Sequence, residues 1–224
     1  MRTAHIQATL IGHYGDDLTV VNAARVSFEK ESGYVQFSDD PEDKMLSTPD
    51  AKLITYLAKH KHFSPFNHAF LSFRVKAPIF VARQLVKHKF MPWNEVSRRY
   101  VDSEPEFFIP DVFRAKADNV KQGSSDEPFP DYYSHDMKAH CRASLNLYHW
   151  YLEHKMCPEQ ARMVLPANMM TEWIWSGTLG AFADMLKLRL DPHTQKESRD
   201  VANLIYAQAL PLFPVSLAAL LENK

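Results

Sequence analysis

Basic and polar side chains are concentrated between residues 83 and 100. This stretch holds five lysines and arginines together with a His, a Gln, a Glu and a Ser. Lysine and arginine donate charged hydrogen bonds to phosphate, while amide, carboxylate and hydroxyl groups match the polar edge of a planar ring. The stretch therefore indicates a site for an anion that carries a ring. Residue type alone favours a simpler interpretation, a solvated basic helix end whose cations offset the helix dipole.

A helix followed by an extended segment is expected to carry these side chains. The helix begins at Pro78, because the missing N–H of proline costs nothing at the first helical position, and Pro92 ends it. Gln84, Lys87 and His88 are three and four residues apart, so they share one helical face. Beyond the helix, alternate residues of an extended chain lie on one side. The polar residues grouped in this way are Glu95, Ser97 and Arg99.

The order of these residues resembles the signature of the flavin-dependent thymidylate synthases. That signature is a basic–His–basic triplet, seven further residues and a Ser, with Asn-Glu before the Ser and Arg-Tyr after it. Here the triplet is Lys87-His88-Lys89 and the Ser is Ser97, with Asn94-Glu95 and Arg99-Tyr100 at the matching positions. The family has Arg at both outer positions of the triplet, where this chain has Lys.

Other segments are similar to the same family, and they follow in its order along the chain. The segments are Ala23–Phe28, His62–His68 (His-x-Ser-Pro-Phe-x-His), Ala161–Pro166 (Ala-Arg-x-x-Leu-Pro) and Leu186–Glu197 (Leu-x-Leu-Arg-x-Asp-x-His-x-Gln-x-Glu). The resemblance runs from about residue 21 to residue 210. Such colinearity is more specific than any single motif, although residues 100–155 contribute little to it.

The resemblance implies ligand contacts at individual positions. The residues implied at dUMP are Gln84, Lys87, Glu95, Ser97, Arg98, Arg99, Arg162 and Arg189. The residues implied at FAD are Ser64, Lys87, His88, Lys89, Glu95, Thr178 and Asp184. The family commonly has Asn or a similar residue at positions 178 and 184. His62 is implied in the lining of the site. Arg189 is the implied catalytic residue, because the equivalent arginine of the family favours the ionised pyrimidine N3.

The resemblance also implies an activity and an assembly. The family converts dUMP to dTMP with methylenetetrahydrofolate as carbon donor, FAD as hydride carrier and NADPH to reload the flavin. Its fold is α+β, a mixed sheet with helices packed around it, and it is a homotetramer whose flavin sites lie between subunits. The family needs no cysteine nucleophile, so neither Cys141 nor Cys157 is expected to act in catalysis.

Composition and charge limit the number of domains, the kinds of partner and the cellular compartment that can be expected. A chain of 224 residues with 46% hydrophobic and 24% charged residues predicts a single globular domain over residues 1–224. The net charge of −1 provides no global field for nucleic acid, and no apolar run is long enough to span a membrane. Two cysteines and a polar N-terminus favour a reducing cytoplasm. Metal is not expected, because His60, His62 and His68 have no nearby Cys, Asp or Glu to complete a ligand set.

Two other interpretations remain open. The lysines at positions 87 and 89, where the family has arginine, are consistent with a family relative that binds flavin or folate but has lost the reaction. A nucleic-acid-binding module would instead combine basic side chains with stacking platforms. Its residues would be Lys87, Lys89, Arg98 and Arg99 with Trp93 and Tyr100. Such a module would be colourless and bind nucleic acid in a salt-sensitive way, whereas a flavoprotein is yellow.

Hydrophobic periodicity and turn residues predict the remaining elements. The expected strands are 5–10, 69–75 and 168–175, the last one ended by a turn at Ser176-Gly177. The expected helices are 18–27, 48–59, 132–155, 158–166 and 178–190, followed by a final helix. Thr194 and Glu197 have the spacing of a capping box for that final helix. Residues 29–44 and 107–130 are expected to be loops.

Overall fold

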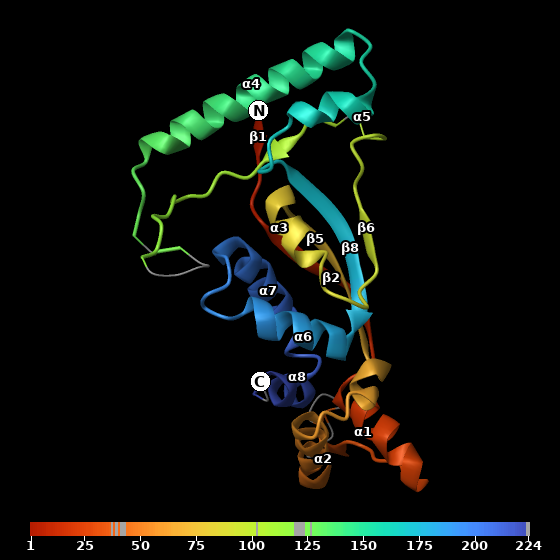
Figure 1. Cartoon of the computed structure of the whole chain (residues 1–224). Helices are drawn as coiled ribbons and strands as arrows, with labels where there is room; N and C mark the ends of the chain where they lie inside the picture. The colour runs from red at the N-terminus through yellow and green to blue at the C-terminus, as the bar shows by residue number, and fades with distance from the viewer. Residues whose placement is uncertain are drawn as a thin grey trace.

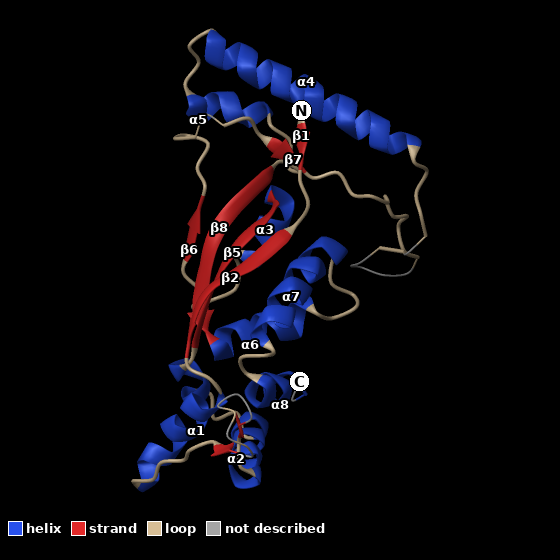
Figure 2. Ribbon diagram, turned by 180° about the vertical axis from the view of Figure 1, so that it is seen from behind, coloured by secondary structure: helices blue, strands red, loops and turns tan. Residues whose placement is uncertain are grey.

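A computed structural model of the chain describes residues 1–36, 38, 40, 44–101, 103–118, 124–125 and 127–222. Helices pack on one face and at both ends of a four-stranded sheet (Figures 1 and 2). The fold is therefore α+β, as the resemblance implied, but the expected mixed sheet is wrong, because this sheet is antiparallel throughout. Parts of the loops predicted over 29–44 and 107–130 lie outside the described residues.

The central sheet has the strand order β2-β5-β8-β6, and each neighbouring pair is antiparallel. Its strands are β2 (Gln7–Tyr14), β5 (Phe70–Pro78), β8 (Met170–Thr178) and β6 (Trp93–Glu95). Successive side chains of a strand point to opposite faces. The register sets Phe73 opposite Trp175 and Val75 opposite Trp173. These four side chains are at most 1% exposed, so one face of the sheet lies against the core.

Helices cover that face and both ends of the sheet. The α-helices are α1 (Asp17–Arg25), α2 (Thr48–Lys59), α3 (Ile79–Leu85), α4 (Tyr132–Glu153), α5 (Pro158–Ala161), α6 (Leu179–Arg189), α7 (Lys196–Ala209) and α8 (Pro214–Glu222). Short 3-10 helices are η1 (Val26–Phe28), η2 (Ser64–His68) and η3 (Arg162–Val164). The helices α3, α6 and α7 pack on the buried face. At one end of the sheet lie α1, α2 and α8, and at the other end lie α4 and α5 (Figures 1 and 2).

Two small strand pairs complete the fold. β1 (Arg2–Thr3) pairs in parallel with β7 (Glu106–Phe107), and β3 (Val35–Gln36) pairs antiparallel with β4 (Lys44–Met45). Phe107 contributes to a second, smaller hydrophobic cluster beneath α4, together with Leu145 and the fully buried Cys141. Because this cluster anchors α4 and α5, it also holds η3, the segment that carries Arg162.

The strand β8 is longer than the sequence predicted. It continues through Ser176 and Gly177, where a turn was expected. The pairing with β5 extends to this end, with Ser176 opposite Ser72 and their hydroxyl oxygens 2.7 Å apart. A Cβ at Gly177 would lie 3.2 Å from Cγ of Met91, so the glycine allows a close contact within the sheet layer. The turn prediction was wrong because this glycine serves packing.

The helix α3 is shorter than the sequence predicted. It ends at Leu85 rather than near Pro92, so Lys87 and His88 lie beyond it. The guanidinium of Arg189 donates from Nη2 to the carbonyl oxygen of Gln84 at 3.1 Å. Carbonyl groups in the last turn of a helix lack intrahelical donors, and here a distant arginine supplies one. The predicted shared helical face is therefore replaced by a helix end and a turn.

The start of α7 also differs from the prediction. Its N-cap is Gln195 rather than Thr194. The hydroxyl of Thr194 donates to the carbonyl oxygen of Leu188 at 2.7 Å, and the carboxylate of Glu197 accepts from Arg114 and Gln195. The predicted capping box is absent because both side chains make contacts outside the local turn.

Candidate functional site

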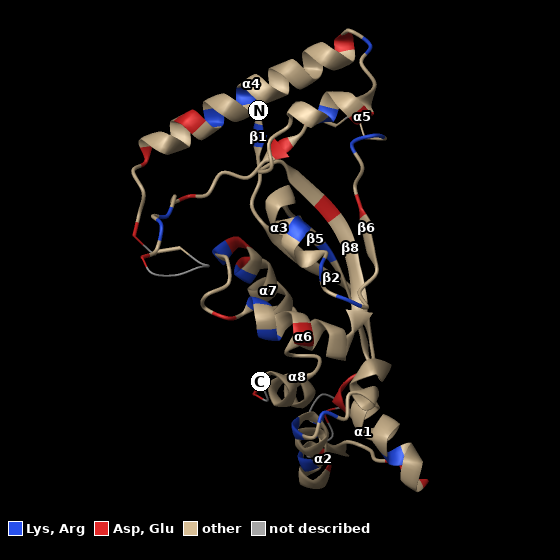
Figure 3. Cartoon of the chain, in the orientation of Figure 1, with Lys and Arg blue, Asp and Glu red and all other residues tan. Residues whose placement is uncertain are grey.

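Most of the residues predicted to bind ligands lie in three groups in the structure. We name them the α5 cavity, the Arg189 cluster and the α2 cavity. The α5 cavity has a volume of about 540 Å³ and includes Glu95, Arg98 and Arg162 in its lining. Figure 3 shows the basic segment that follows β6 beside α5, where this cavity lies.

The lining of the α5 cavity carries more cations than carboxylates, with Arg83, Arg98 and Arg162 against Glu95 and Glu159. Oε1 of Glu95 accepts from the hydroxyl of Thr171 at 2.7 Å, and Oε2 accepts from Nε1 of Trp93 at 3.0 Å. Arg162 is exposed, and its Nε donates to the carbonyl oxygen of Glu159 at 3.3 Å. Burial lowers the pKa of Arg98 from its usual value. An anion would compensate the positive charge here, and the fixed carboxylate could accept from a hydroxyl group.

The segment after β6 is extended for a shorter distance than predicted. The N–H of Val96 donates to the carbonyl oxygen of Glu172 at 2.9 Å, and the chain then turns at residues 98–100. Because of this turn, Arg99 does not continue the alternation from Glu95. Its Nε instead donates to the hydroxyl of Ser97 at 3.2 Å. The structure thus brings Ser97 and Arg99 together by a local contact.

The Arg189 cluster forms where α6 ends against the end of α3. Nε of Arg189 donates to Nε2 of His88 at 3.0 Å, in addition to the bond from Nη2 to Gln84. Burial, with a further contribution from the charge of Arg189, lowers the pKa of His88 to about 4. His88 is therefore neutral at pH 7 and accepts this hydrogen bond. Burial also lowers the pKa of Arg189, but a guanidinium retains its charge at that pH.

The side chain of Gln84 is held by residues that the sequence analysis did not identify. Its Nε2 donates to Oε1 of Gln195, and its Oε1 accepts from the hydroxyl of Ser198 at 3.1 Å. Gln195 in turn donates to Glu197 at 3.0 Å. Residues 195 and 197 belong to the Gln-x-Glu at the end of the segment 186–197. That motif was a usable signal, but Glu197 was interpreted as the partner of Thr194 in a helix cap.

The α2 cavity has a volume of about 760 Å³ and lies between α1, α2 and η2. His62 and Ser64 line it, together with Ser27, Lys30 and Tyr56. Cationic, hydroxyl and aromatic groups in one cavity suit a ligand that combines phosphate with planar rings. The structure therefore places two of the predicted residues in a second cavity of suitable chemistry.

Four other predicted residues lie outside these groups. The hydroxyl of Thr178 accepts from the N–H of Ala181 at 3.1 Å and donates to Oδ1 of Asn67 at 2.8 Å. Thr178 is thus the N-cap of α6, which is a structural role. Asp184 is exposed on α6, and its Oδ1 is 3.7 Å from Nζ of Lys187. Lys87 and Lys89 are exposed in the turn after α3.

The two cavities lie at opposite ends of the sheet. Both ribbon views place α5 at one end and α1 with α2 at the other (Figures 1 and 2). Within the described residues, no three His, Cys, Asp or Glu side chains gather where they could share a metal ion. No helix in the same part of the chain is long and apolar enough to cross a membrane.

The comparison with known sequences identifies the family. Residues 9–215 match the family described as thymidylate synthase complementing protein. The flavin-dependent thymidylate synthase of Thermus thermophilus is 36% identical over 96% of this chain and 75% of its own length. The enzyme of the same name from Kosmotoga olearia is 36% identical over 95% of this chain and 89% of its own length. The chain belongs to the flavin-dependent thymidylate synthase family.

Solved structures agree with this membership. The crystal structure of a UMP/dUMP methylase PolB from Streptomyces cacaoi, bound with 5-Br dUMP, has a TM-score of 0.81 and 28% identity. The likeness covers 97% of this chain and 95% of that chain. The same methylase bound with 5-Br UMP has a TM-score of 0.84. The predicted resemblance is confirmed: this flavin-dependent thymidylate synthase family member is an enzyme of the α+β fold, and the nucleic-acid-binding alternative is set aside.

Proposed function

We propose that this enzyme reductively methylates C5 of dUMP to give dTMP, with FAD as its flavin. The Arg189 cluster carries the proposal, because residues from two separate family-like segments meet there around one guanidinium. Membership of the family and the names of relatives at 36% identity support the same reaction.

Arg189 has the proposed role of activating the pyrimidine. Attack from C5 needs electron density, and a uracil that has lost its N3 proton supplies it. A guanidinium carries five N–H donors, and in this structure His88 and Gln84 accept from two of its nitrogens. These two bonds fix its plane, so that the remaining donors can stabilise negative charge on N3 and the adjacent carbonyl groups. Because His88 is neutral, it accepts from Arg189 without adding a second positive charge.

The α5 cavity is the proposed site for the phosphate and sugar of dUMP. Arg98 and Arg162 provide cations in its lining, and Glu95 provides an acceptor for a sugar hydroxyl. Ser97 and Arg99 lie in the segment directly after β6 and can donate to the nucleotide. Lys87 is exposed after α3, where we propose that it contacts both nucleotide and flavin.

The α2 cavity is the proposed site for part of FAD, which supplies hydride transfer when bound. Its lining fits that cofactor, because Lys30 can pair with phosphate, Ser27 and Ser64 can donate to polar groups, and Tyr56 offers a ring face. His62 lines the same cavity. Further contacts to FAD are proposed for His88, Lys89, Glu95, Thr178 and Asp184.

The chemistry of the reaction requires a one-carbon donor and a reductant. Replacing the C5 hydrogen of uracil by a methyl group requires a CH₂ unit and a hydride. We propose methylenetetrahydrofolate as the source of the carbon and NADPH as the source of the hydride that reloads the flavin. Cys141 and Cys157 line neither the α5 cavity nor the α2 cavity, so no step is assigned to a thiolate.

A complete site is proposed to form between copies of the chain in a homotetramer. The two cavities lie at opposite ends of one sheet, so a single copy does not bring their ligands together (Figure 1). Strands β2 and β5 leave Ile11 and Phe70 exposed at 49% and 47%, and Phe90 in the turn after α3 is 88% exposed. Apolar exposure of this kind is typical of surfaces covered in an assembly. Each chain is proposed to be one domain over residues 1–224 that works in the cytoplasm.

An activity assay with the purified protein tests the proposal. We expect a yellow protein that forms dTMP from dUMP when methylenetetrahydrofolate and NADPH are present, and none when either is omitted. UMP is assayed in parallel, because the solved relative is a UMP/dUMP methylase. A protein that binds FAD but produces no dTMP would favour the inactive-relative interpretation. A protein that does not bind added FAD would refute the proposed function.

A further inference from the structure

The carboxylate of Glu197 lies at the start of a chain of hydrogen bonds that ends at Gln84. Glu197 is only 6% exposed. Its Oε1 accepts from Nη2 of Arg114 at 2.9 Å, and its Oε2 accepts from Nε2 of Gln195 at 3.0 Å. Burial by itself would raise the pKa of this carboxyl. Hydrogen bonds from its own backbone N–H, Gln195 and Arg114, together with the charge of Arg114, outweigh burial and lower the pKa below its usual value. Glu197 is therefore ionised at pH 7 and can only accept hydrogen bonds.

Because Glu197 can only accept hydrogen bonds, it determines the orientation of the Gln195 amide and, through it, that of the Gln84 amide. An ionised carboxylate accepts only from the NH₂ group of Gln195, so the Oε1 of Gln195 must point the other way. That oxygen accepts from Nε2 of Gln84. In this orientation the hydroxyl of Ser198, which can donate or accept, donates to the Oε1 of Gln84 at 3.1 Å. Reversing either amide would set donors against donors or oxygen atoms against oxygen atoms.

We propose that Glu197, held by Arg114, is a positioning residue that orients the Gln84 amide for nucleotide binding. The inference rests on the proposed function, in which Gln84 contacts dUMP. It assigns a role to Arg114, which lies in the segment after β7 and belongs to none of the family-like segments. It also explains why Glu197 is buried at a helix start without forming a capping box.

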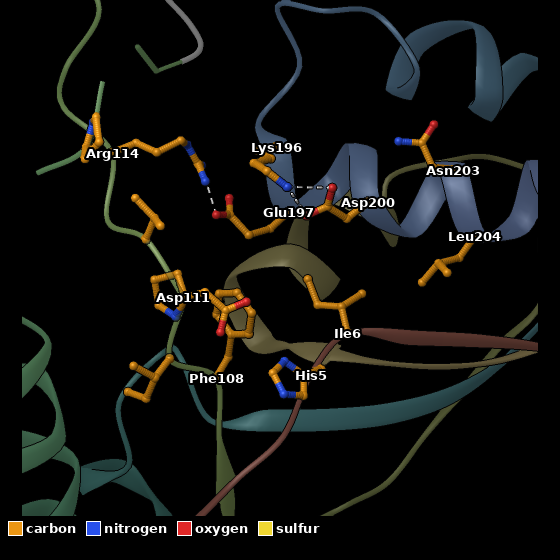
Figure 4. Close-up of a pocket in the computed structure, with 14 residues that line it drawn as sticks. His5, Ile6, Phe108, Asp111, Arg114, Lys196, Glu197, Asp200, Asn203 and Leu204 are labelled. Carbon is orange, nitrogen blue, oxygen red and sulfur yellow. Dashed lines mark hydrogen bonds and ion pairs between the residues drawn. The ribbon is translucent and has the colours of Figure 1, made fainter. Parts of the chain in front are cut away.

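The same helix offers a matched control. Nζ of Lys196 donates to Asp200 at 3.0 Å across one turn of α7. Figure 4 shows this pair and the Arg114–Glu197 pair beside the same cavity of about 710 Å³. The bonds that reach Gln84 pass through Glu197 and Gln195, whereas the Lys196–Asp200 bond lies outside that path. Neutralising Asp200 therefore removes a neighbouring ion pair without disturbing the amide orientation.

The test measures dUMP binding to the FAD-loaded, full-length enzyme by titration calorimetry. Glu197→Gln keeps the shape of the side chain but can present either an oxygen or an NH₂ group to Gln195. We expect dUMP to bind about tenfold more weakly, with FAD content unchanged. Gln84→Ala should weaken binding to a similar degree, and adding Glu197→Gln to Gln84→Ala should have no further effect, because the first residue acts through the second. Asp200→Asn should bind dUMP like the wild type.

Each outcome decides the inference. If Glu197→Gln fails to fold, Gln195→Met breaks the same path while it leaves the Arg114–Glu197 pair intact, and it should give the same loss and the same non-additivity with Gln84→Ala. Wild-type affinity in Glu197→Gln, or losses that multiply in the double variant, would overturn the positioning role. That result, obtained with a wild-type enzyme that binds dUMP, would leave the proposed function standing. A wild-type enzyme that does not bind dUMP would refute both.

Discussion

The substitution Arg189→Lys separates a directed guanidinium from a simple positive charge. In the structure, Arg189 donates from Nε to His88 at 3.0 Å and from Nη2 to Gln84 at 3.1 Å. A lysine has one ammonium group at the end of a flexible chain, so it cannot reproduce two bonds from fixed positions on one plane. The variant keeps the charge and loses the geometry.

The expected effect follows from these bonds. A hydrogen bond to a charged group contributes about 1.5–3 kcal/mol. Loss of one such bond in the transition state would slow turnover roughly 10- to 150-fold. FAD content is measured alongside, because His88, which accepts from Arg189, is itself a proposed FAD contact. Arg189 does not line the α2 cavity, so a role confined to the pyrimidine predicts FAD content close to that of the wild type.

The assay measures dTMP formation at saturating dUMP, with FAD content determined for each sample. Arg199→Lys is the matched control, because Nη1 of Arg199 also donates to a backbone carbonyl, that of Pro192, at 2.6 Å. We expect the control to retain wild-type turnover. Near-equal rates for Arg189→Lys and the wild type would refute the activating role. Equal losses in both variants would indicate that any change of this kind around the connection between α6 and α7 disturbs the fold.

Three further predictions address the nucleotide, the thiols and pH. Arg162→Ala should weaken dUMP binding by about ten- to a hundredfold, because it removes charged hydrogen bonds in the α5 cavity; unchanged affinity by calorimetry would mean that the nucleotide lies elsewhere. The double variant Cys141→Ser, Cys157→Ser should keep its activity, and a folded but inactive protein would call for a thiolate mechanism. Because the pKa of His88 is about 4 in the fold and 6.5 in a free histidine, the unfolded chain binds the proton first as pH falls. Wild-type stability should therefore decrease relative to His88→Gln between pH 6.5 and pH 4, by roughly 1–2 kcal/mol after allowance for partial exposure. Denaturant unfolding at pH 7 and pH 4.5 measures this difference, and parallel pH profiles would contradict it.

The sequence by itself determined the family and most of the regular elements. The order of the short segments from Ala23 to Glu197 was enough for the family, because several motifs in one order are improbable by chance. The helix from Thr48 is confirmed, as are the long helix α4 and the strand core of β5. In each of these elements, buried side chains recur with the period of a helix or of a strand. The spacing of apolar residues in the sequence therefore predicts the type of element directly.

Only the tertiary structure decided where elements end and which polar side chains meet. Leu85 ends α3 where a guanidinium reaches the carbonyl group of Gln84 from a residue 105 positions away. Glu197 takes part in a path of bonds to Gln84 instead of a capping box, and Ser198 contacts the same glutamine across 114 positions. Local spacing contains no information about such partners. The separation of the α5 cavity from the α2 cavity has the same origin, because the sheet fixes the distance between segments that the sequence only orders.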